Sequence, residues 1–194
     1  MKKLSIRSLV VATVVGVAGV AMVGCTTTQE SAQSSPRSDR ASIDAQVDAT
    51  LSRLYEAAPG SRELVARAKG VLVFPAVIGG SFVVGVEHGE GQLRVGNKPH
   101  SRYTTTGASI GWQAGGQSKA VIYVFSTQEA LDKFISGNGW SGGVDATVAV
   151  GHIGANGSID TQTAQAPVSS YVLTNTGLEA GVSLQGSKIT RVMR

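Results

Sequence analysis

The sequence predicts an α+β fold, with a mainly antiparallel β-sheet or barrel-like core, an N-terminal amphipathic helix and two short helices. Short apolar, β-branched runs follow one another over most of residues 71–194, with few helical patterns between them. Glycine is abundant, with 25 residues among 194, and only 15% of residues are charged. Together these features favour strands joined by tight turns over a parallel βαβ sheet.

The first 24 residues predict a secretory signal peptide. A basic start, Lys2-Lys3 and Arg7, precedes an apolar run over 9–23. This run is shorter than the roughly 20 residues that a spanning helix needs. Cys25 follows it directly and is the only cysteine in the chain.

A cysteine at this position resembles the lipobox of bacterial lipoproteins, in which the thiol receives a diacylglycerol before cleavage. We therefore expect Cys25 to be the lipid attachment site and the first residue of the mature chain. Met22 and Val23 depart from the Leu and the Ala or Ser that this motif prefers. An ordinary signal peptide or an uncleaved anchor is therefore the alternative.

The charge of the chain changes when residues 1–24 are removed. Without Lys2, Lys3 and Arg7 the net charge falls from +4 to +1. A nearly neutral protein has no overall field that would attract nucleic acid. Residues 25–40 are rich in Thr, Ser and Gln and predict a flexible tether, so we expect one folded domain over 41–194.

The helix predicted first covers Ser42–Ala58 and ends at Pro59-Gly60. Its apolar residues recur every three or four positions and form one stripe, namely Ile43, Val47, Leu51, Leu54 and Ala58. A second short helix follows, with Ser61 as its N-cap and Gly70 at its end. A third opens at the capping-box pattern Ser126–Glu129 and ends at Gly137.

The strands are predicted from short apolar or alternating runs. One run is stopped by Pro75, and a hairpin is expected to turn at Gly89-Glu90-Gly91, with another at Asn156-Gly157. The expected strands are 71–74, 81–86, 92–95, 103–113, 120–125, 146–153, 158–162, 168–173, 180–184 and 188–192.

The sequence contains one pattern typical of a catalytic motif, but its surroundings argue against catalysis. Gly107–Gly111 matches the G-x-S-x-G pattern, and Asp132 or Asp145 and then His152 follow in hydrolase order. The pattern lies inside an alternating strand, however, and a nucleophile elbow needs a strand, a sharp turn and a helix. A serine hydrolase that uses Ser109 therefore stays a minor alternative.

No cofactor or metal is expected from the remaining patterns. The string 137–142 matches G-x-G-x-x-G but follows a helix, so a loop is expected there. The three histidines, His88, His100 and His152, have no metal-ligand spacing.

The densest basic cluster of the mature chain lies in and after the first helix, and it suggests a membrane contact. Its members are Arg53, Arg62, Arg67 and Lys69. In one interpretation the apolar stripe packs on the sheet and the basic residues are a solvated face. In the other, Ile43, Val47, Leu51 and Leu54 enter a membrane interface while the basic side chains meet anionic headgroups.

Several strings, in this order and spacing, resemble the SYLF family of lipid-binding domains, also described as actin-binding. They are Ala68–Pro75, Gly85–Gly91, Ser109–Gln117, Ala130–Phe134, Asp145–Gly154 and Gly177–Ser187. The resemblance implies a lipid-binding module, with phosphoinositides as eukaryotic ligands and actin as a partner of some members. It places membrane contact on an amphipathic N-terminal segment and nearby basic residues.

The sequence therefore predicts a non-enzymatic lipid-binding domain on a bacterial envelope lipoprotein. The expected ligand is an anionic phospholipid or a phosphoinositide-like headgroup. Thr26 follows Cys25 where an acidic residue would oppose outer-membrane sorting, so we expect an outer-membrane anchor. The alternative is a structural or protein-interaction lipoprotein of the envelope without lipid specificity.

Overall fold

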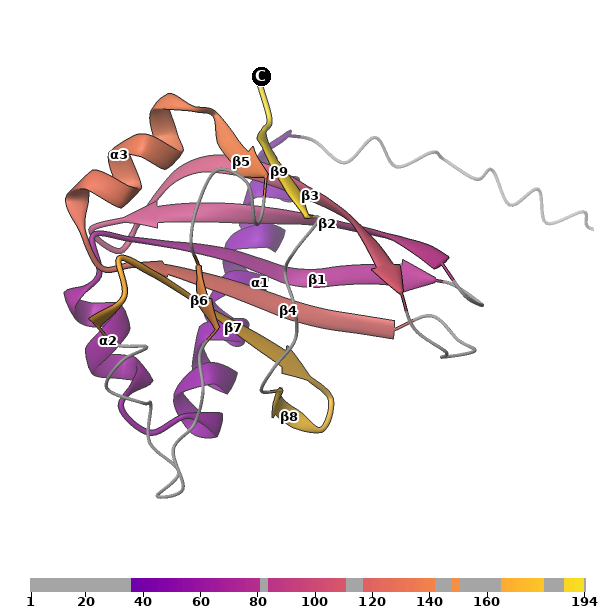
Figure 1. Cartoon of the computed structure of the whole chain (residues 1–194), viewed down its shortest axis with the longest axis horizontal. Coiled ribbons are helices and arrows are strands. Elements are labelled where there is room, and N and C mark those ends of the chain that lie inside the picture. The colour runs from indigo at the N-terminus through magenta and orange to yellow at the C-terminus, as the bar shows by residue number, and fades with distance from the viewer. Residues whose placement is uncertain are drawn as a thin grey trace, which may run out of the picture. The chain divides into compact units, whose positions relative to one another are not determined.

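The computed structural model describes residues 36–80, 84–110, 117–141, 148–150, 165–179 and 187–193. The helices in these ranges are α1 (Pro36–Ala57), α2 (Ser61–Arg67) and α3 (Gln128–Ser136). The strands are β1 (Gly70–Gly80), β2 (Val84–Val95), β3 (Lys98–Ile110), β4 (Gln117–Phe125), β5 (Gly139–Ser141), β6 (Ala149–Val150), β7 (Val168–Thr174), β8 (Gly177–Glu179) and β9 (Lys188–Arg191). All of them join one sheet (Figure 1).

The sheet confirms the predicted α+β class with mainly antiparallel pairing. Its order is β5-β9-β3-β2-β1-β4-β7-β6, with β8 paired to β7. Only the β6–β7 pair is parallel among the described strands. Neighbouring strands that follow each other in sequence, such as β1, β2 and β3, account for the middle of this order.

The sheet is rolled, although the described pairings do not close it into a barrel. Trp140 lies on β5 at one end of the order, five strands away from β4. Its ring centroid is nevertheless 5.8 Å from that of Tyr123 and 5.5 Å from that of Phe125, both on β4. Because β5 and β6 are not paired with each other in the described residues, the barrel-like core is better stated as a rolled open sheet.

Both faces of the central strands are buried, which explains why these strands are continuously apolar. On β4, Ile122 and Val124 face the cluster that contains α1 and α2, whereas Val121 and Tyr123 face the cluster that contains α3. The α3 side is aromatic, with Phe134 at 4.7 Å from Tyr103 and 4.8 Å from Trp140 between ring centroids. The rolled sheet is therefore the middle layer between two sets of helices.

Helix α1 carries the predicted apolar stripe and packs it against the sheet. All five stripe residues, of which Ala58 directly follows the helix, are at most 6% exposed and belong to the same cluster as β1, β4 and β7 side chains. The helix begins at Pro36 rather than at Ser42, and so includes the last residues expected for the tether. Proline suits a first helical turn because the missing N–H would have no partner there.

Two helix N-termini differ in detail from the predictions. Ser61 does not cap α2, since the N-cap is Gly60 and the buried Ser61 hydroxyl donates instead to the Leu54 carbonyl at 3.1 Å. Helix α3 is capped by Thr127, whose hydroxyl accepts from the Ala130 N–H, rather than by Ser126. Each helix nevertheless occupies the predicted part of the chain.

The predicted break at Pro75 is a bulge inside a longer strand. Strand β1 runs on to Gly80, and its pairing shifts between Val73 and Ala76 on β2 and between Phe74 and Val77 on β4. Proline lacks an N–H for the ladder, and a bulge accommodates this loss in a central strand.

The predicted hairpin at Gly89-Glu90-Gly91 is wrong, because these residues lie in the middle of β2. A Cβ at Gly89 would lie 2.8 Å from the Ala76 carbonyl oxygen, so glycine is needed there for close strand packing rather than for a turn. The hairpin between β2 and β3 turns instead at Gly96-Asn97. Both residues have positive φ, 56° and 62°, as a two-residue turn of this kind requires.

Of the remaining predictions, several strands are confirmed, one loop is replaced by a strand, and others concern segments outside the described residues. Strands β3, β4, β7 and β9 confirm their predicted runs, and β5 replaces the loop that was expected over 137–142. Residues 1–35, the Asn156-Gly157 hairpin and the predicted strands 158–162 and 180–184 lie outside the described ranges.

Candidate functional site

A hollow lies between α1, α2 and the beginning of β1. It has a volume of about 520 Å³. Its walls are mostly apolar or small residues of these three elements, joined by two arginines and the turn that follows β2. The lining residues are Leu51, Tyr55, Arg62, Val65, Ala66, Ala68, Gly70, Val71, Arg94, Gly96 and Asn97.

The short helix α2 forms one wall of the hollow. Gly60 adopts a positive φ of 90° between α1 and α2, which turns the chain back sharply. Leu64 on α2 is buried in the same cluster as the α1 stripe, while Val65 is only partly buried and Ala66 is exposed. One face of α2 thus joins the core, and its neighbouring face borders the hollow.

The apolar residues predicted to enter a membrane interface lie in the protein core. Ile43 and Leu51 are 6% and 5% exposed, and Val47 and Leu54 are fully buried. Their partners are sheet residues, so core packing, the plainer of the two interpretations, is what the structure shows for this stripe. Leu51 alone among them also lines the hollow. Their burial favours core packing, and lipid contact by these four side chains stays a prediction.

The predicted basic residues are all exposed, and the structure divides them into two groups. Arg62 lines the hollow with its guanidinium carbon 4.4 Å from the centroid of the Tyr55 ring. Arg67 and Lys69 follow in the same segment, and the Arg67 Nε–H donates to the Glu63 carbonyl at 3.3 Å. Arg53 instead donates to the carbonyl of Thr174 at 2.9 Å, toward the β7–β8 turn, and does not line the hollow.

Arg94 is a second cation at the hollow, and the sequence analysis did not single it out. It lies on β2, is 8% exposed and forms an ion pair with Asp48 on α1. Its Nε–H donates to Gln92 Oε1 at 3.2 Å, and its Nη2 donates to the Asp44 carbonyl at 3.2 Å. The available signal was the pattern Gln92-Leu93-Arg94, which places two polar side chains on the face of β2 that meets α1.

Tyr55 completes the polar part of the wall. Burial raises the pKa of its hydroxyl, while the nearby guanidinium groups of Arg62 and Arg94 act in the opposite direction. The phenol is therefore neutral at physiological pH and can donate a hydrogen bond. The hollow combines an apolar lining with two cations and one neutral hydroxyl group.

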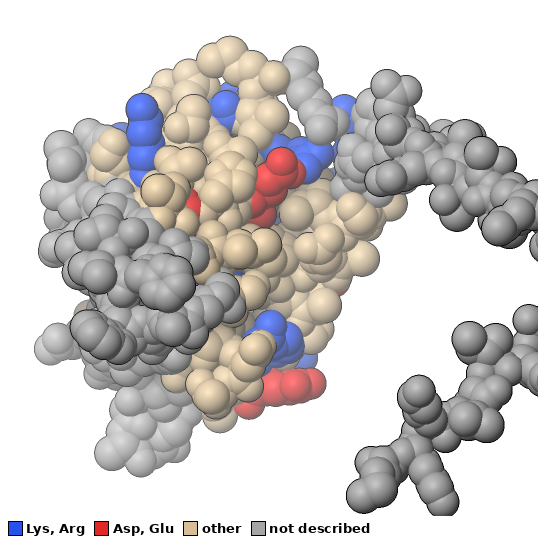
Figure 2. All heavy atoms as spheres, turned by 90° about the vertical axis from the view of Figure 1, so that its right-hand side faces the viewer, with Lys and Arg blue, Asp and Glu red and all other residues tan. Residues whose placement is uncertain are grey.

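Away from α2, two basic side chains of the central strands are paired with carboxylates. Figure 2 views the molecule from the right-hand side of Figure 1, and its coloured residues show blue side chains scattered and partly beside red ones. The two pairs are Arg102–Glu90, between β3 and β2, and Lys119–Glu87, between β4 and β2. In Figure 1, α2 lies at the opposite end of the sheet.

The described residues offer no metal centre and no nucleophile elbow. No group of three or more His, Cys, Asp or Glu side chains comes together in them in a way that could hold an ion. Ser109 lies within β3, paired with Gly85 on β2, rather than in a sharp turn before a helix. Asp132 accepts a hydrogen bond from Gln128 on α3, while Asp145 and His152 lie outside the described ranges. None of the described helices is both long enough and apolar enough to cross a membrane.

A known family matches the second part of the chain, beyond the residues that line the hollow. Residues 106–193 match the family model Ysc84, described as "Las17-binding protein actin regulator". This match confirms the SYLF resemblance, and these residues form a SYLF-family sequence running from β3 to the end of β9. The family is a lipid- and actin-binding type of domain and not a family of enzymes. No curated protein matches the chain.

Proposed function

We propose that the protein is a non-enzymatic lipid-binding domain that is anchored to a bacterial envelope membrane through Cys25. Its ligand is an anionic phospholipid, which it contacts at the hollow beside α2. The observation that carries this proposal is the hollow of about 520 Å³, whose wall combines Arg62 with apolar side chains. Arg67 and Lys69 lie exposed in the same short segment and add to its positive charge.

The chemistry of the hollow suits a molecule that is anionic at one end and apolar at the other. Each Arg or Lys close to an anionic membrane surface contributes about 1 kcal/mol of attraction. Val65, Ala66 and Val71 offer apolar contact to the glycerol backbone or the first part of an acyl chain. A phosphoinositide-like headgroup would gain more from the basic cluster than a singly charged lipid because it carries more phosphates.

The proposed mode of binding differs in one respect from the insertion of an amphipathic helix into the membrane interface. The stripe of α1 stays in the core, so binding does not require α1 to leave the sheet and expose Leu54 or Val47. The membrane contact is assigned instead to α2 and the segment after it. For the same reason Leu51→Asp would disrupt the core and is a poor probe of lipid binding.

The anchor at Cys25 is supported by the sequence that precedes it. A basic start, a short apolar run and Gly24-Cys25 are the features of a lipoprotein signal. Two or more acyl chains would hold the protein stably on its membrane, whereas one chain is marginal. Mass spectrometry of the mature N-terminal peptide tests this step, and an unmodified Cys25 would contradict it.

Vesicle flotation tests the lipid-binding step with a chain that begins at Thr26. Such a chain keeps the compact unit Ser34–Arg194, which contains both hydrophobic clusters described above. We expect it to float with vesicles of phosphatidylcholine and phosphatidylglycerol but not with phosphatidylcholine alone. The binding should weaken as salt is raised, because salt screens exposed charges.

Charge reversal identifies the surface that binds. The double variant Arg67→Glu, Lys69→Glu should lower the partition coefficient by at least about tenfold, as the loss of two contributions of roughly 1 kcal/mol implies. The matched control is Lys133→Glu, Lys188→Glu, which reverses two exposed charges elsewhere. Equal losses in both double variants would contradict the assignment to α2, and no flotation of the wild-type chain would favour a protein-interaction role.

A further inference from the structure

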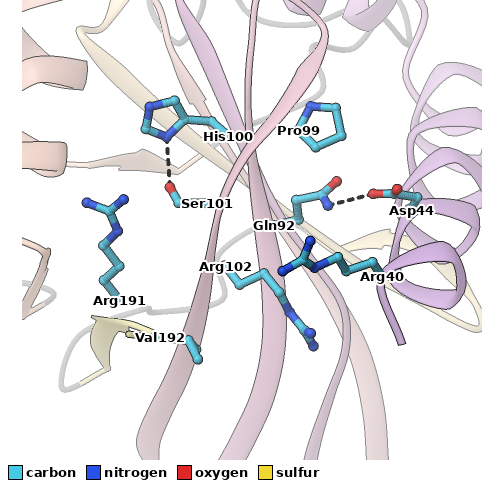
Figure 3. A pocket seen from close by; sticks show the side chains of 9 residues that line it. All are labelled: Arg40, Asp44, Gln92, Pro99, His100, Ser101, Arg102, Arg191 and Val192. Carbon is cyan, nitrogen blue, oxygen red and sulfur yellow. Dashed lines mark hydrogen bonds between the residues drawn. The ribbon is translucent and has the colours of Figure 1, made fainter. Parts of the chain in front are cut away.

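A second hollow, of about 370 Å³, lies between the N-terminal part of α1, strand β3 and the end of β9. The lining residues that carry charge or can bind an anion are Arg40, Asp44, Gln92, His100, Arg102 and Arg191. Figure 3 shows Arg40 extending from α1 toward Gln92 and Arg102, with Arg191 and His100 on the other side of β3. None of these six residues lines the hollow beside α2.

The N–H donors of the arginines in this hollow outnumber the acceptor atoms that the described residues around them provide. Arg40 and Arg191 form no ion pair within the described part of the chain. Arg102 pairs with Glu90 through Nη2 only, and its Nε and Nη1 are buried without a hydrogen-bond partner. The one carboxylate in the lining, Asp44, already accepts from Gln92 Nε2 at 2.6 Å.

This arrangement has a physical cost that an oxyanion would remove. Like charges around one hollow repel each other, and buried N–H groups without acceptors destabilise the protein. A phosphate offers several acceptor oxygens and two negative charges, and guanidinium groups match its geometry with paired hydrogen bonds. The volume is at the lower end of small-molecule sites, which suits a phosphate ester with a small substituent.

We propose that this hollow binds a phosphate monoester. Arg40 and Arg191 are the groups assigned to the phosphate, since neither guanidinium has an ion-pair partner among the described residues. Arg102 contributes positive charge from the wall, and His100 is a further donor at the rim. The phosphate belongs either to a free ester in solution or to a lipid headgroup that ends in a phosphate monoester.

Thermal unfolding of the full chain in detergent micelles measures this binding. Glycerol 3-phosphate should raise the unfolding temperature beyond the effect of sodium chloride at equal ionic strength. Arg40→Gln and Arg191→Gln should each weaken the apparent Kd by about tenfold, and the double variant should abolish the shift. The matched control Lys188→Gln removes an exposed charge from the same strand as Arg191 and should leave the Kd unchanged.

A second arm separates the two sources of the phosphate. Phosphatidic acid in mixed micelles carries the same phosphate monoester on two acyl chains. Similar shifts with phosphatidic acid and glycerol 3-phosphate would assign the site to a free ester. A shift with phosphatidic acid alone, lost in the double variant, would assign it to a lipid headgroup. Both outcomes support the site.

The inference is overturned if the Arg40→Gln, Arg191→Gln double variant responds to both ligands as the wild type does, or if sodium chloride reproduces every shift. Its failure is distinct from failure at α2. Arg67→Glu, Lys69→Glu should retain the response to glycerol 3-phosphate, and the variants of Arg40 and Arg191 leave the hollow beside α2 intact.

Discussion

The guanidinium of Arg94 on β2 lies 2.5 Å from the carboxylate of Asp48 on α1, measured from Nη1 to Oδ1. This contact links the helix that carries the apolar stripe to the strand behind it. Arg94 is also part of the wall of the hollow beside α2, so the same side chain fixes α1 and shapes the candidate site.

Replacing Arg94 should therefore destabilise the fold more than replacing its partner. Arg94→Met removes three hydrogen bonds and leaves Gln92 Oε1 and the Asp44 carbonyl without this donor. We expect a loss of about 2–3 kcal/mol in the free energy of unfolding, measured with urea. Asp48→Asn should cost less than about 1 kcal/mol, since the Asp48 side chain is 67% exposed. Equal losses would contradict a buried structural role for Arg94.

The raised pKa of Tyr123 predicts that the free energy of unfolding falls at alkaline pH. Burial raises the pKa of its hydroxyl from 10.0 to about 12, with a smaller raising effect from Glu87 and an opposing hydrogen bond from Ser187. Between these two pKa values the folded protein keeps the proton and the unfolded chain loses it. Stability due to Tyr123 is therefore complete below pH 10 and falls as the pH rises toward 12.

The size of this fall is about 2–3 kcal/mol, at 1.36 kcal/mol per unit of pKa difference. Urea unfolding at several pH values from 9 to 12 measures it, and Tyr123→Phe should remove this part of the fall. Tyr55 and Tyr171 also have raised pKa values and act in the same direction, so the difference between wild type and variant isolates Tyr123. A variant with the full pH dependence of the wild type would refute the assignment.

Filling the hollow beside α2 tests its part in lipid binding separately from charge. Ala66 is exposed and lines the hollow, so Ala66→Trp adds a large ring there without entering the core. We expect weaker flotation with anionic vesicles and a change in unfolding free energy within about 0.5 kcal/mol, as for other surface substitutions. An exposed alanine away from the hollow, Ala41, provides the matched Trp control. Unchanged flotation of Ala66→Trp would show that the hollow itself takes no part.

Periodicity in the sequence placed the apolar residues of α1 on one face but left open whether that face meets the sheet or a membrane, and local signals misassigned β2. The four-and-three spacing of the stripe depends only on helix geometry, so the sequence predicts that Val47 and Leu54 share a face, and the sheet then buries both. Gly89 and Gly91 look like turn residues, yet their role is to let β1 approach closely. A Cβ at Gly91 would meet the Phe74 ring and lie 2.5 Å from the Val73 carbonyl oxygen. The need for glycine at these positions arises from the pairing of β2 with β1, which a short stretch of sequence does not reveal.

The candidate site was predictable only in part for the same reason. Arg62, Arg67 and Lys69 are close in sequence, so their cluster was apparent. The hollow beside them depends on Arg94 and on the turn after β2, which pairing with β1 brings to α2. The side-chain direction of Leu51, inward rather than toward a membrane, likewise required the position of the sheet.

Hydrogen–deuterium exchange of the Thr26 chain, with and without anionic vesicles, tests the central claim most directly because it locates the contact. We predict slower exchange in residues 61–70, which include α2, when anionic vesicles are present. Residues 128–136 in α3 should exchange at an unchanged rate, and neutral vesicles should have no effect on either segment. Unchanged exchange over 61–70, or equal slowing in both segments, would contradict lipid binding at α2.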